Sequence, residues 1–191
     1  ILDLEVDFLD SGKGSIFEHC KKSIDKVLSR RSERGLCLMG EGDWNDGFNG
    51  VGVKWKGESV WLSHFMYGIL KEFASVCSRL NRETEHISEY LSASEKIKGA
   101  ILKYARDEKW FIIATTDKGT ILGSETCEKG KIHLNAQTWA VINEVVSREE
   151  GRKILLEVEK HLYKDYGVLL FTPAYDVPDK EIGYLTRYAP A

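Results

Sequence analysis

Residues 41–50 read EGDWNDGFNG: two aspartates flank a Trp-Asn pair, and glycines lie on both sides. Asp, Asn and Gly are turn-forming residues, so the segment could be a simple turn. A simple turn, however, needs neither a tryptophan among its polar residues nor the five glycines found here within thirteen residues (Gly40, Gly42, Gly47, Gly50 and Gly52). We therefore treat this segment, the 41–50 loop, as a candidate functional site.

Two common ligand-binding motifs do not fit the 41–50 loop. An EF-hand calcium loop needs Gly at its sixth position and Glu at its twelfth. Counted from Asp43, those positions hold Phe48 and Lys54, and counting from Glu41 fails as well. A nucleotide P-loop needs the order G-x-x-x-x-G-K-[ST], which is absent, and acidic side chains would repel a phosphate. Neither calcium nor a nucleotide is therefore predicted to bind here.

The residue types of the loop suit carbohydrate chemistry. A tryptophan ring can cover the C–H face of a sugar, while carboxylates accept hydrogen bonds from its hydroxyl groups. A carboxylic acid beside an indole would be partly desolvated, which raises its pKa and suits a general acid for glycoside cleavage. Asp43 and Asp46 are three residues apart, so one could stay charged and help the other hold its proton. The loop alone does not identify which of them is the acid.

The composition predicts one soluble globular domain. The chain has 191 residues, of which 42% are hydrophobic and 30% are charged. A net charge of −3 argues against a nucleic-acid-binding surface, which needs clustered basic residues. No apolar run approaches ~20 residues, so we expect no membrane-spanning segment.

The cysteines and histidines show no metal-binding pattern. The four cysteines form no CxxC pair and are expected to be reduced, mostly buried thiols of a cytoplasmic protein: Cys20, Cys37, Cys77 and Cys127. The five histidines have no ligand spacing, so no metal site is predicted: His19, His64, His86, His133 and His161.

Helical periodicity predicts a mainly α chain. Ser15 and Ser147 each precede a Glu by three residues, the capping-box spacing that starts a helix. Apolar residues then recur at helical spacing, and on the longest helix they predict a buried face: Trp61, Phe65, Ile69, Phe73, Val76 and Leu80. The expected helices cover residues 15–30, 59–80, 87–107, 136–146 and 147–163.

The remaining segments are predicted to be loops with short β-like pieces. Residues 110–116 read as a β-like stretch, and residues 117–119 as a turn toward a second short piece at 121–122. Residues 168–191 hold all three prolines and are expected to be extended. Because the unusual residues lie in the loops, we expect function there, held by the helices.

Four further blocks of sequence accompany GDWNDGFN at residues 42–49: KGESVWL at 56–62, NAQTWAVI at 135–142, FTPAY at 171–175 and GYLTRYAP at 183–190. Together, and in this order, the five blocks closely resemble glycoside hydrolase family 94. That family contains the cellobiose and chitobiose phosphorylases and the phosphorylase-like domain of cyclic β-1,2-glucan synthases.

The resemblance implies an (α/α)6 toroid, that is, inner and outer rings of helices with the active site at one mouth. Such a toroid has about twelve helices, whereas about five are predicted here. Residues 1–191 are therefore expected to form part of an (α/α)6 catalytic domain, truncated at both ends. The expected partner is the remaining half of the toroid, or a second copy in a homo-oligomer.

The resemblance also implies a reaction. Asp46 matches the family's general acid, Trp44 would line the sugar site, and Asp43 would be a supporting carboxylate. The implied reaction is inverting phosphorolysis of a β-linked disaccharide or short oligosaccharide, which gives an α-sugar 1-phosphate. Inorganic phosphate is then the co-substrate, and no metal or organic cofactor is implied.

Three other positions are candidate substrate contacts. Tyr188 matches an aromatic residue near the acceptor side of the family's site, Arg187 could reach an anion or a hydroxyl, and Gln137 lies at the start of a predicted helix. Trp139 is expected in the core and Glu58 in a bracing role. The family's phosphate-binding segment would follow the end of this chain, where Ala191 stands in place of the usual glycine.

Two other interpretations remain open at this point. One is the phosphorylase-like domain of a cyclic β-1,2-glucan synthase, and the other is a sugar-binding half-domain without chemistry. The sequence also does not distinguish glucose from N-acetylglucosamine at the donor site.

Overall fold

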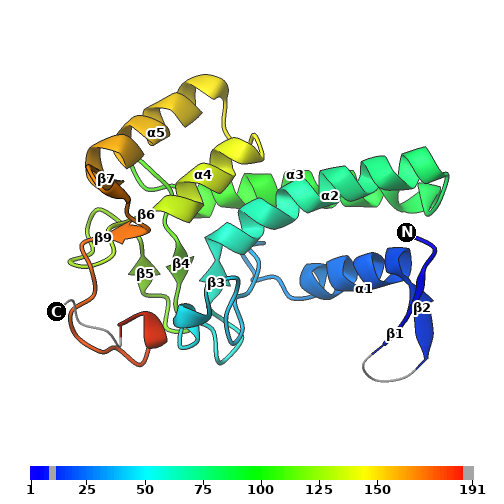
Figure 1. Cartoon of the computed structure of the whole chain (residues 1–191), viewed down its shortest axis with the longest axis horizontal. Helices are drawn as coiled ribbons and strands as arrows, with labels where there is room; N and C mark the ends of the chain where they lie inside the picture. The colour runs from blue at the N-terminus through cyan, green and yellow to red at the C-terminus, as the bar shows by residue number, and fades with distance from the viewer. Residues whose placement is uncertain (9–11, 187–191) are drawn as a thin grey trace.

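The computed structural model describes residues 1–8 and 12–186, and within them five α-helices form most of the regular structure (Figure 1). The two longest, α2 and α3, pack side by side as an antiparallel hairpin, and α4 and α5 form a second, shorter pair. The helices are α1 (Ile16–Leu28), α2 (Val60–Leu80), α3 (Ile87–Tyr104), α4 (Leu134–Ile142) and α5 (Arg148–Leu162).

The strands are short and lie between the helices. Three of them form the antiparallel sheet β3-β4-β5, and the others pair as β1–β2, β6–β9 and β7–β8. Their bounds are β1 (Glu5–Asp7), β2 (Lys13–Ser15), β3 (Glu58–Ser59), β4 (Ala114–Thr115), β5 (Ile121–Leu122), β6 (Ile132–His133), β7 (Tyr163–Lys164), β8 (Gly167–Val168) and β9 (Phe171–Thr172). The prediction of a mainly α chain with short β segments in its loops is confirmed for the described residues.

Serine caps fix the starts of three helices where the sequence predicts them. Ser15 and Ser147 make both hydrogen bonds of a capping box, with Glu18 and Glu150 respectively. Ser59 caps α2 through its side-chain oxygen, which accepts a hydrogen bond from the Leu62 N–H.

Two helix ends differ from the prediction. Helix α3 ends at Tyr104 rather than near residue 107, because the chain turns back and Arg106 forms a β-bridge with Phe111. Helix α4 covers Leu134–Ile142 rather than 136–146. There Asn143 donates its side-chain amide to the His64 carbonyl, and Glu144 adopts a left-handed backbone conformation that helices do not continue through.

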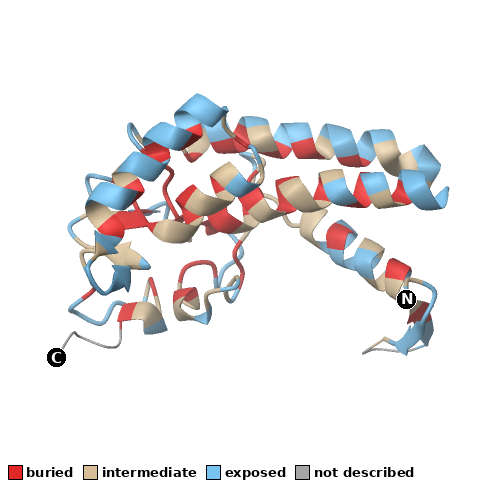
Figure 2. Ribbon diagram, turned by 45° about the horizontal axis from the view of Figure 1, so that its top comes forward, coloured by how far each residue is buried: buried red, intermediate tan, exposed pale blue. Residues whose placement is uncertain are grey.

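The predicted buried face of α2 is confirmed in part: Trp61 and Phe73 are buried, and Phe65, Ile69 and Val76 are partly buried against the core. Figure 2 shows the buried residues of α2 and α3 where the two helices face each other. Phe65, Ile69 and Val76 instead line a groove of about 490 Å³ between α1 and α2, and Leu80 is exposed. The prediction missed other buried residues of α2, among them Ser63, Met66, Tyr67, Leu70, Ala74 and Cys77.

The cysteine prediction holds in part. All four thiols are free, and Cys37 and Cys77 are buried, but Cys20 is exposed and Cys127 half-exposed.

Among the described residues, no helix is long and apolar enough to cross a bilayer.

Candidate active site

The 41–50 loop is tied to the start of α2 by Asp43. The Asn45 N–H donates to Asp43 Oδ1 at 2.8 Å, and the Ser59 hydroxyl donates to Asp43 Oδ2 at 2.6 Å. Ser59 is fully buried, and its oxygen also accepts the Leu62 N–H at 2.9 Å. Asp43 is therefore linked through one hydroxyl to the first turn of a 21-residue helix.

The environment of Asp43 makes its charged form less favourable. Burial raises the pKa of the Asp43 carboxyl, and the nearby charge of Asp46 acts in the same direction, whereas the hydrogen bonds from Ser59 and Asn45 oppose the shift. This loop therefore contains a desolvated carboxyl, as the sequence predicts.

Asp46 lies in the opposite situation. It begins the 3₁₀ turn η1 (Asp46–Phe48), which Asn45 caps by accepting the Gly47 N–H at 3.0 Å. Among the described residues Asp46 makes no side-chain hydrogen bond or ion pair, and its side chain is exposed. Phe48, in the same turn, is buried and anchors it. The backbone of the turn therefore holds Asp46 in place, while its carboxyl oxygens have no hydrogen-bond partner among the described residues.

Trp44 lies at the edge of an aromatic cluster. Its ring is 6.0 Å from that of Trp61, which stacks on Phe65 at 5.3 Å and meets Trp139 edge-on at 5.8 Å. Trp44 is 44% exposed, so indole surface remains available for a ligand next to both aspartates. Trp139 is half-buried and packs against the core rather than lying within it.

The C-terminal segment packs against the loop. The 3₁₀ turn η3 (Tyr184–Thr186) contacts η1, and the Tyr184 N–H donates to Asn49 Oδ1 at 2.9 Å. Gly183 permits this approach, since a Cβ there would lie 2.3 Å from the same oxygen and its φ is +113°. The last described turn of the chain thus lies against the turn that contains Asp46. Arg187 and Tyr188 lie outside the described residues.

Glu181 fastens this C-terminal segment to the turn after β4. It accepts hydrogen bonds from Thr116 (2.5 Å) and Thr120 (3.0 Å) and from the Lys118 ammonium (2.8 Å). The Lys118 contact is the main reason that the pKa of Glu181 falls to about 2, and the two threonine hydroxyls add to it.

Contacts at and just before β3 hold the segment that follows the 41–50 loop. Glu58 is buried, accepts hydrogen bonds from Arg34 and from the Thr115 hydroxyl (2.7 Å), and forms a salt bridge with Arg34. The Asp117 carboxylate accepts three backbone N–H bonds from residues 54, 56 and 57. The bracing role expected of Glu58 agrees with these contacts.

Gln137 does not lie at the surface of the site. It is fully buried, and its amide pairs with both backbone groups of Phe111 at 2.8 Å while donating to the His133 carbonyl at 2.9 Å. Because the Gln137 amide makes these bonds inside the core, it is not presented to a substrate. This differs from the expectation that Gln137 contacts the sugar. The amide instead joins α4 to the segment that leads into β4.

Ser59 and Trp61 are site residues that sequence reasoning missed. Both lie in the KGESVWL block, but Ser59 was predicted only as a helix start, because its bond to Asp43 spans 16 residues. Trp61 was predicted only as a buried helix residue. Among the described residues, the one group close enough to share a metal ion is Glu83, Glu85 and His86, in the turn at the far end of α2 from Ser59.

A mainly helical chain that presents an acidic, aromatic-lined loop has the features of a carbohydrate-active enzyme domain. The family model described as "Glycosyl hydrolase 94 superfamily, catalytic domain" matches residues 1–191. The chain therefore belongs to glycoside hydrolase family 94, as the resemblance indicated.

Two curated relatives are phosphorylases by name. The chain is 35% identical over 189 residues to a solabiose phosphorylase of Paenibacillus borealis, covering 99% of this chain and 25% of that protein. It is 30% identical to a cellobionic acid phosphorylase of Neurospora crassa, covering 99% of this chain and 24% of that protein. The chain thus spans about a quarter of the length of these curated relatives.

A solved structure shares the fold. A GH78 family rhamnosidase of a Bacillus species superposes with a TM-score of 0.59 over 75% of this chain and 14% of that one, at 15% identity. At this identity the likeness concerns the fold alone.

Proposed function

We propose that the protein containing this chain is an inverting glycoside phosphorylase that cleaves a β-linked disaccharide or short oligosaccharide with inorganic phosphate. The observation that carries the proposal is a contrast between two carboxylates beside the exposed Trp44. Asp46 is exposed and makes no side-chain hydrogen bond among the described residues, whereas Asp43 is hydrogen-bonded by Asn45 and Ser59. Family membership and the names of the relatives support the reaction class.

In this proposal Asp46 is the general acid. Its carboxyl gives a proton to the glycosidic oxygen as the bond to the anomeric carbon breaks. A phosphate oxygen attacks that carbon from the opposite face, so the product is an α-sugar 1-phosphate and a shortened sugar. Phosphate is already an anionic nucleophile, so no second carboxylate is needed as a base.

The neighbouring residues would position the substrate and the acid. Trp44 would pack on a sugar ring, and Asp43 would hold the loop in shape through Asn45 and Ser59. Arg187 and Tyr188 would be substrate contacts, since the segment before them lies against η1. Gln137 would support the site from beneath rather than touch the sugar.

The wider setting is also proposed. The chain would form part of an (α/α)6 toroid whose other helices complete the site, in a cytoplasmic enzyme that needs phosphate but neither metal nor organic cofactor. The donor sugar and the linkage would be set by residues contributed from the rest of that toroid.

Two isosteric variants of the complete protein test the assignment of the acid. We would follow sugar 1-phosphate by NMR with several β-linked disaccharides, with and without phosphate, in the wild type, Asp46→Asn and Asp43→Asn. We expect phosphate-dependent α-1-phosphate that Asp46→Asn abolishes and Asp43→Asn only reduces. Loss confined to Asp43→Asn would move the acid to the desolvated carboxyl, and free sugar released without phosphate would make the protein a hydrolase.

A further inference from the structure

The turn between β4 and β5, residues 116–120, binds two segments that lie far apart in the sequence. On one side, the Asp117 carboxylate accepts three backbone N–H groups within residues 54–57, and the Asp117 N–H donates to the Val51 carbonyl at 2.8 Å. On the other side, three side chains of the turn donate to the Glu181 carboxylate: Thr116, Lys118 and Thr120. The turn therefore connects the segment that follows the 41–50 loop to the C-terminal segment.

Residues 179–186 of the C-terminal segment form one hydrogen-bonded unit. The Thr186 hydroxyl accepts the Asp179 N–H at 2.6 Å and donates to the Gly183 carbonyl at 2.9 Å. The Gly183 N–H in turn donates to the Asp179 carbonyl at 2.8 Å. Glu181 lies in the middle of this unit, so a contact that holds Glu181 also holds η3.

The same unit borders the 41–50 loop through two hydrogen bonds. The Tyr184 N–H donates to Asn49 Oδ1 at 2.9 Å, and the Gly50 N–H donates to the Ile182 carbonyl at 3.2 Å. The unit therefore lies directly against the end of the loop that carries the two aspartates.

Together these contacts form a closed ring. It runs from the 41–50 loop through residues 51–57 to the turn at 116–120, then through Glu181 to residues 182–186, and back to the loop. Each segment of the ring is held at two points rather than one. A supporting layer of this kind is what keeps groups at a site in a fixed geometry.

We propose that Glu181 is a positioning residue, which holds residues 182–186 against the 41–50 loop so that the chain after them reaches the substrate. This role rests on the proposed function, in which the next two residues, Arg187 and Tyr188, contact the sugar. Glu181 itself acts through the backbone of η3, since its carboxylate already accepts three hydrogen bonds from the turn after β4.

Two alanine variants of the complete protein test the role. Glu181→Ala removes all three contacts, whereas Asp176→Ala removes another carboxylate of the C-terminal segment, which pairs with Lys129 at 2.5 Å. For Glu181→Ala we expect KM for the disaccharide, and its Kd by calorimetry without phosphate, to rise at least about tenfold. Because Phe48 separately anchors the turn of Asp46, kcat should change less than about threefold. The Asp176→Ala control should match the wild type.

A conservative variant should restore most of the lost affinity. Glu181→Gln keeps an oxygen that can accept the two threonine hydroxyls but loses the charge that pairs with Lys118. The side chain of Lys118 is 75% exposed, so this ion pair should contribute little. We therefore expect Kd for Glu181→Gln within about threefold of the wild type.

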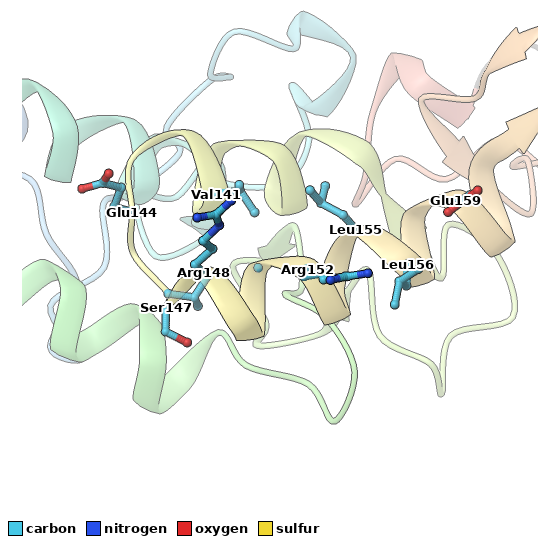
Figure 3. Close-up of a pocket in the computed structure, with 10 residues that line it drawn as sticks. Val141, Glu144, Ser147, Arg148, Arg152, Leu155, Leu156 and Glu159 are labelled. Carbon is cyan, nitrogen blue, oxygen red and sulfur yellow. The ribbon is translucent and has the colours of Figure 1, made fainter.

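Hydrogen exchange tests the contact without relying on turnover. In Glu181→Ala, the amides of residues 179–186 and 49–50 should exchange at least about tenfold faster than in the wild type, because their hydrogen bonds would open more often. Helices α4 and α5, with side chains along a groove of about 720 Å³ (Figure 3), make none of the contacts of the ring and serve as the internal reference. Unchanged exchange there would show that the variant is folded.

Two results would overturn the role of Glu181. Faster exchange at residues 179–186 with unchanged KM and Kd would make its contacts structural only, and unchanged exchange would mean that Glu181 does not hold the segment. A wild-type protein that neither cleaves nor binds the disaccharides would instead overturn the proposed function, and the role of Glu181 with it.

Discussion

Asp46 and Gln137 both stand out in the sequence as polar candidates, yet they lie in opposite environments. Asp46 is exposed, with no hydrogen bond or ion pair among the described residues, and is held by the buried Phe48 in its turn. Gln137 is fully buried, and its amide makes three hydrogen bonds to backbone groups. The contrast separates a group available for chemistry from one that maintains the fold.

Asp43 lies between these extremes. It is half-buried and hydrogen-bonded by Ser59 and Asn45, but it belongs to the same loop as Asp46. A change at Asp46 should therefore affect activity, a change at Gln137 should affect stability, and a change at the Asp43 anchor should affect both.

The largest effect is expected at Asp46 and should depend on the leaving group. With a disaccharide, Asp46→Asn should lower kcat by at least ~100-fold, the usual contribution of a general acid. With a p-nitrophenyl β-glycoside of the same donor sugar, whose leaving group needs no proton, the loss should be much smaller. Steady-state kinetics on the complete protein would measure both.

Glu41→Gln is the matched control for that variant. It neutralises another exposed carboxylate of the same loop and should leave both rates and the melting temperature unchanged. An equal loss with both leaving groups in Asp46→Asn would mean that Asp46 does not supply the proton.

Gln137 should give the largest loss of stability. Gln137→Leu would leave the N–H and C=O of Phe111 buried without partners, so we expect about 2–4 kcal/mol of lost unfolding free energy. Any folded variant should keep its KM, since Gln137 faces no ligand. Urea unfolding followed by circular dichroism would measure the change.

Thr138→Ala provides the comparison for Gln137→Leu. Thr138 is the next residue on α4, and its hydroxyl donates only to carbonyls of its own helix. This variant should lose under about 1 kcal/mol. If Gln137→Leu were equally mild but raised KM, Gln137 would be a substrate contact after all.

The sequence was sufficient for features set by local chemistry. Capping serines determine where α1, α2 and α5 begin, and these starts were predicted correctly. The ordered blocks identified the family. The two carboxylates and the indole of the 41–50 loop do lie together, because they are neighbours in the chain.

Features set by long-range packing were not predictable in the same way. Apolar residues occur on more than one face of α2, so periodicity could not show that Met66 and Leu70 are buried while Phe65 and Ile69 are only partly buried. The role of Gln137 depends on a backbone segment 26 residues away, and the Ser59–Asp43 bond likewise joins distant residues. Such pairings are decided only when the helices assemble.

An intermediate effect is expected at Ser59. Ser59→Ala removes both the N-cap of α2 and the anchor of Asp43, so it should cost about 1–2 kcal/mol of stability. Because the loop would loosen, kcat/KM should also fall, by roughly tenfold if about 1.4 kcal/mol of transition-state stabilisation is lost. Thermal unfolding and kinetics on the complete protein would measure the two effects.

Ser15→Ala separates the two effects of Ser59→Ala. It removes a comparable N-cap, that of α1, whose capping bonds join Ser15 to Glu18 and not to Asp43. We expect a similar loss of stability with unchanged kcat/KM. Equal kinetics in both variants would mean that the Asp43 anchor does not matter for catalysis.

The smallest effect should be a pH dependence of stability from Asp43. Burial raises its pKa in the folded chain, so its contribution to stability is fully present below its unfolded pKa of ~3.9 and is lost as pH rises through the folded value. Asn cannot titrate. Asp43→Asn should therefore gain stability relative to the wild type between about pH 3 and about pH 7. Glu41→Gln should show no such trend, and a trend of opposite sign for Asp43→Asn in urea unfolding would mean that hydrogen bonding, not burial, dominates at this carboxyl.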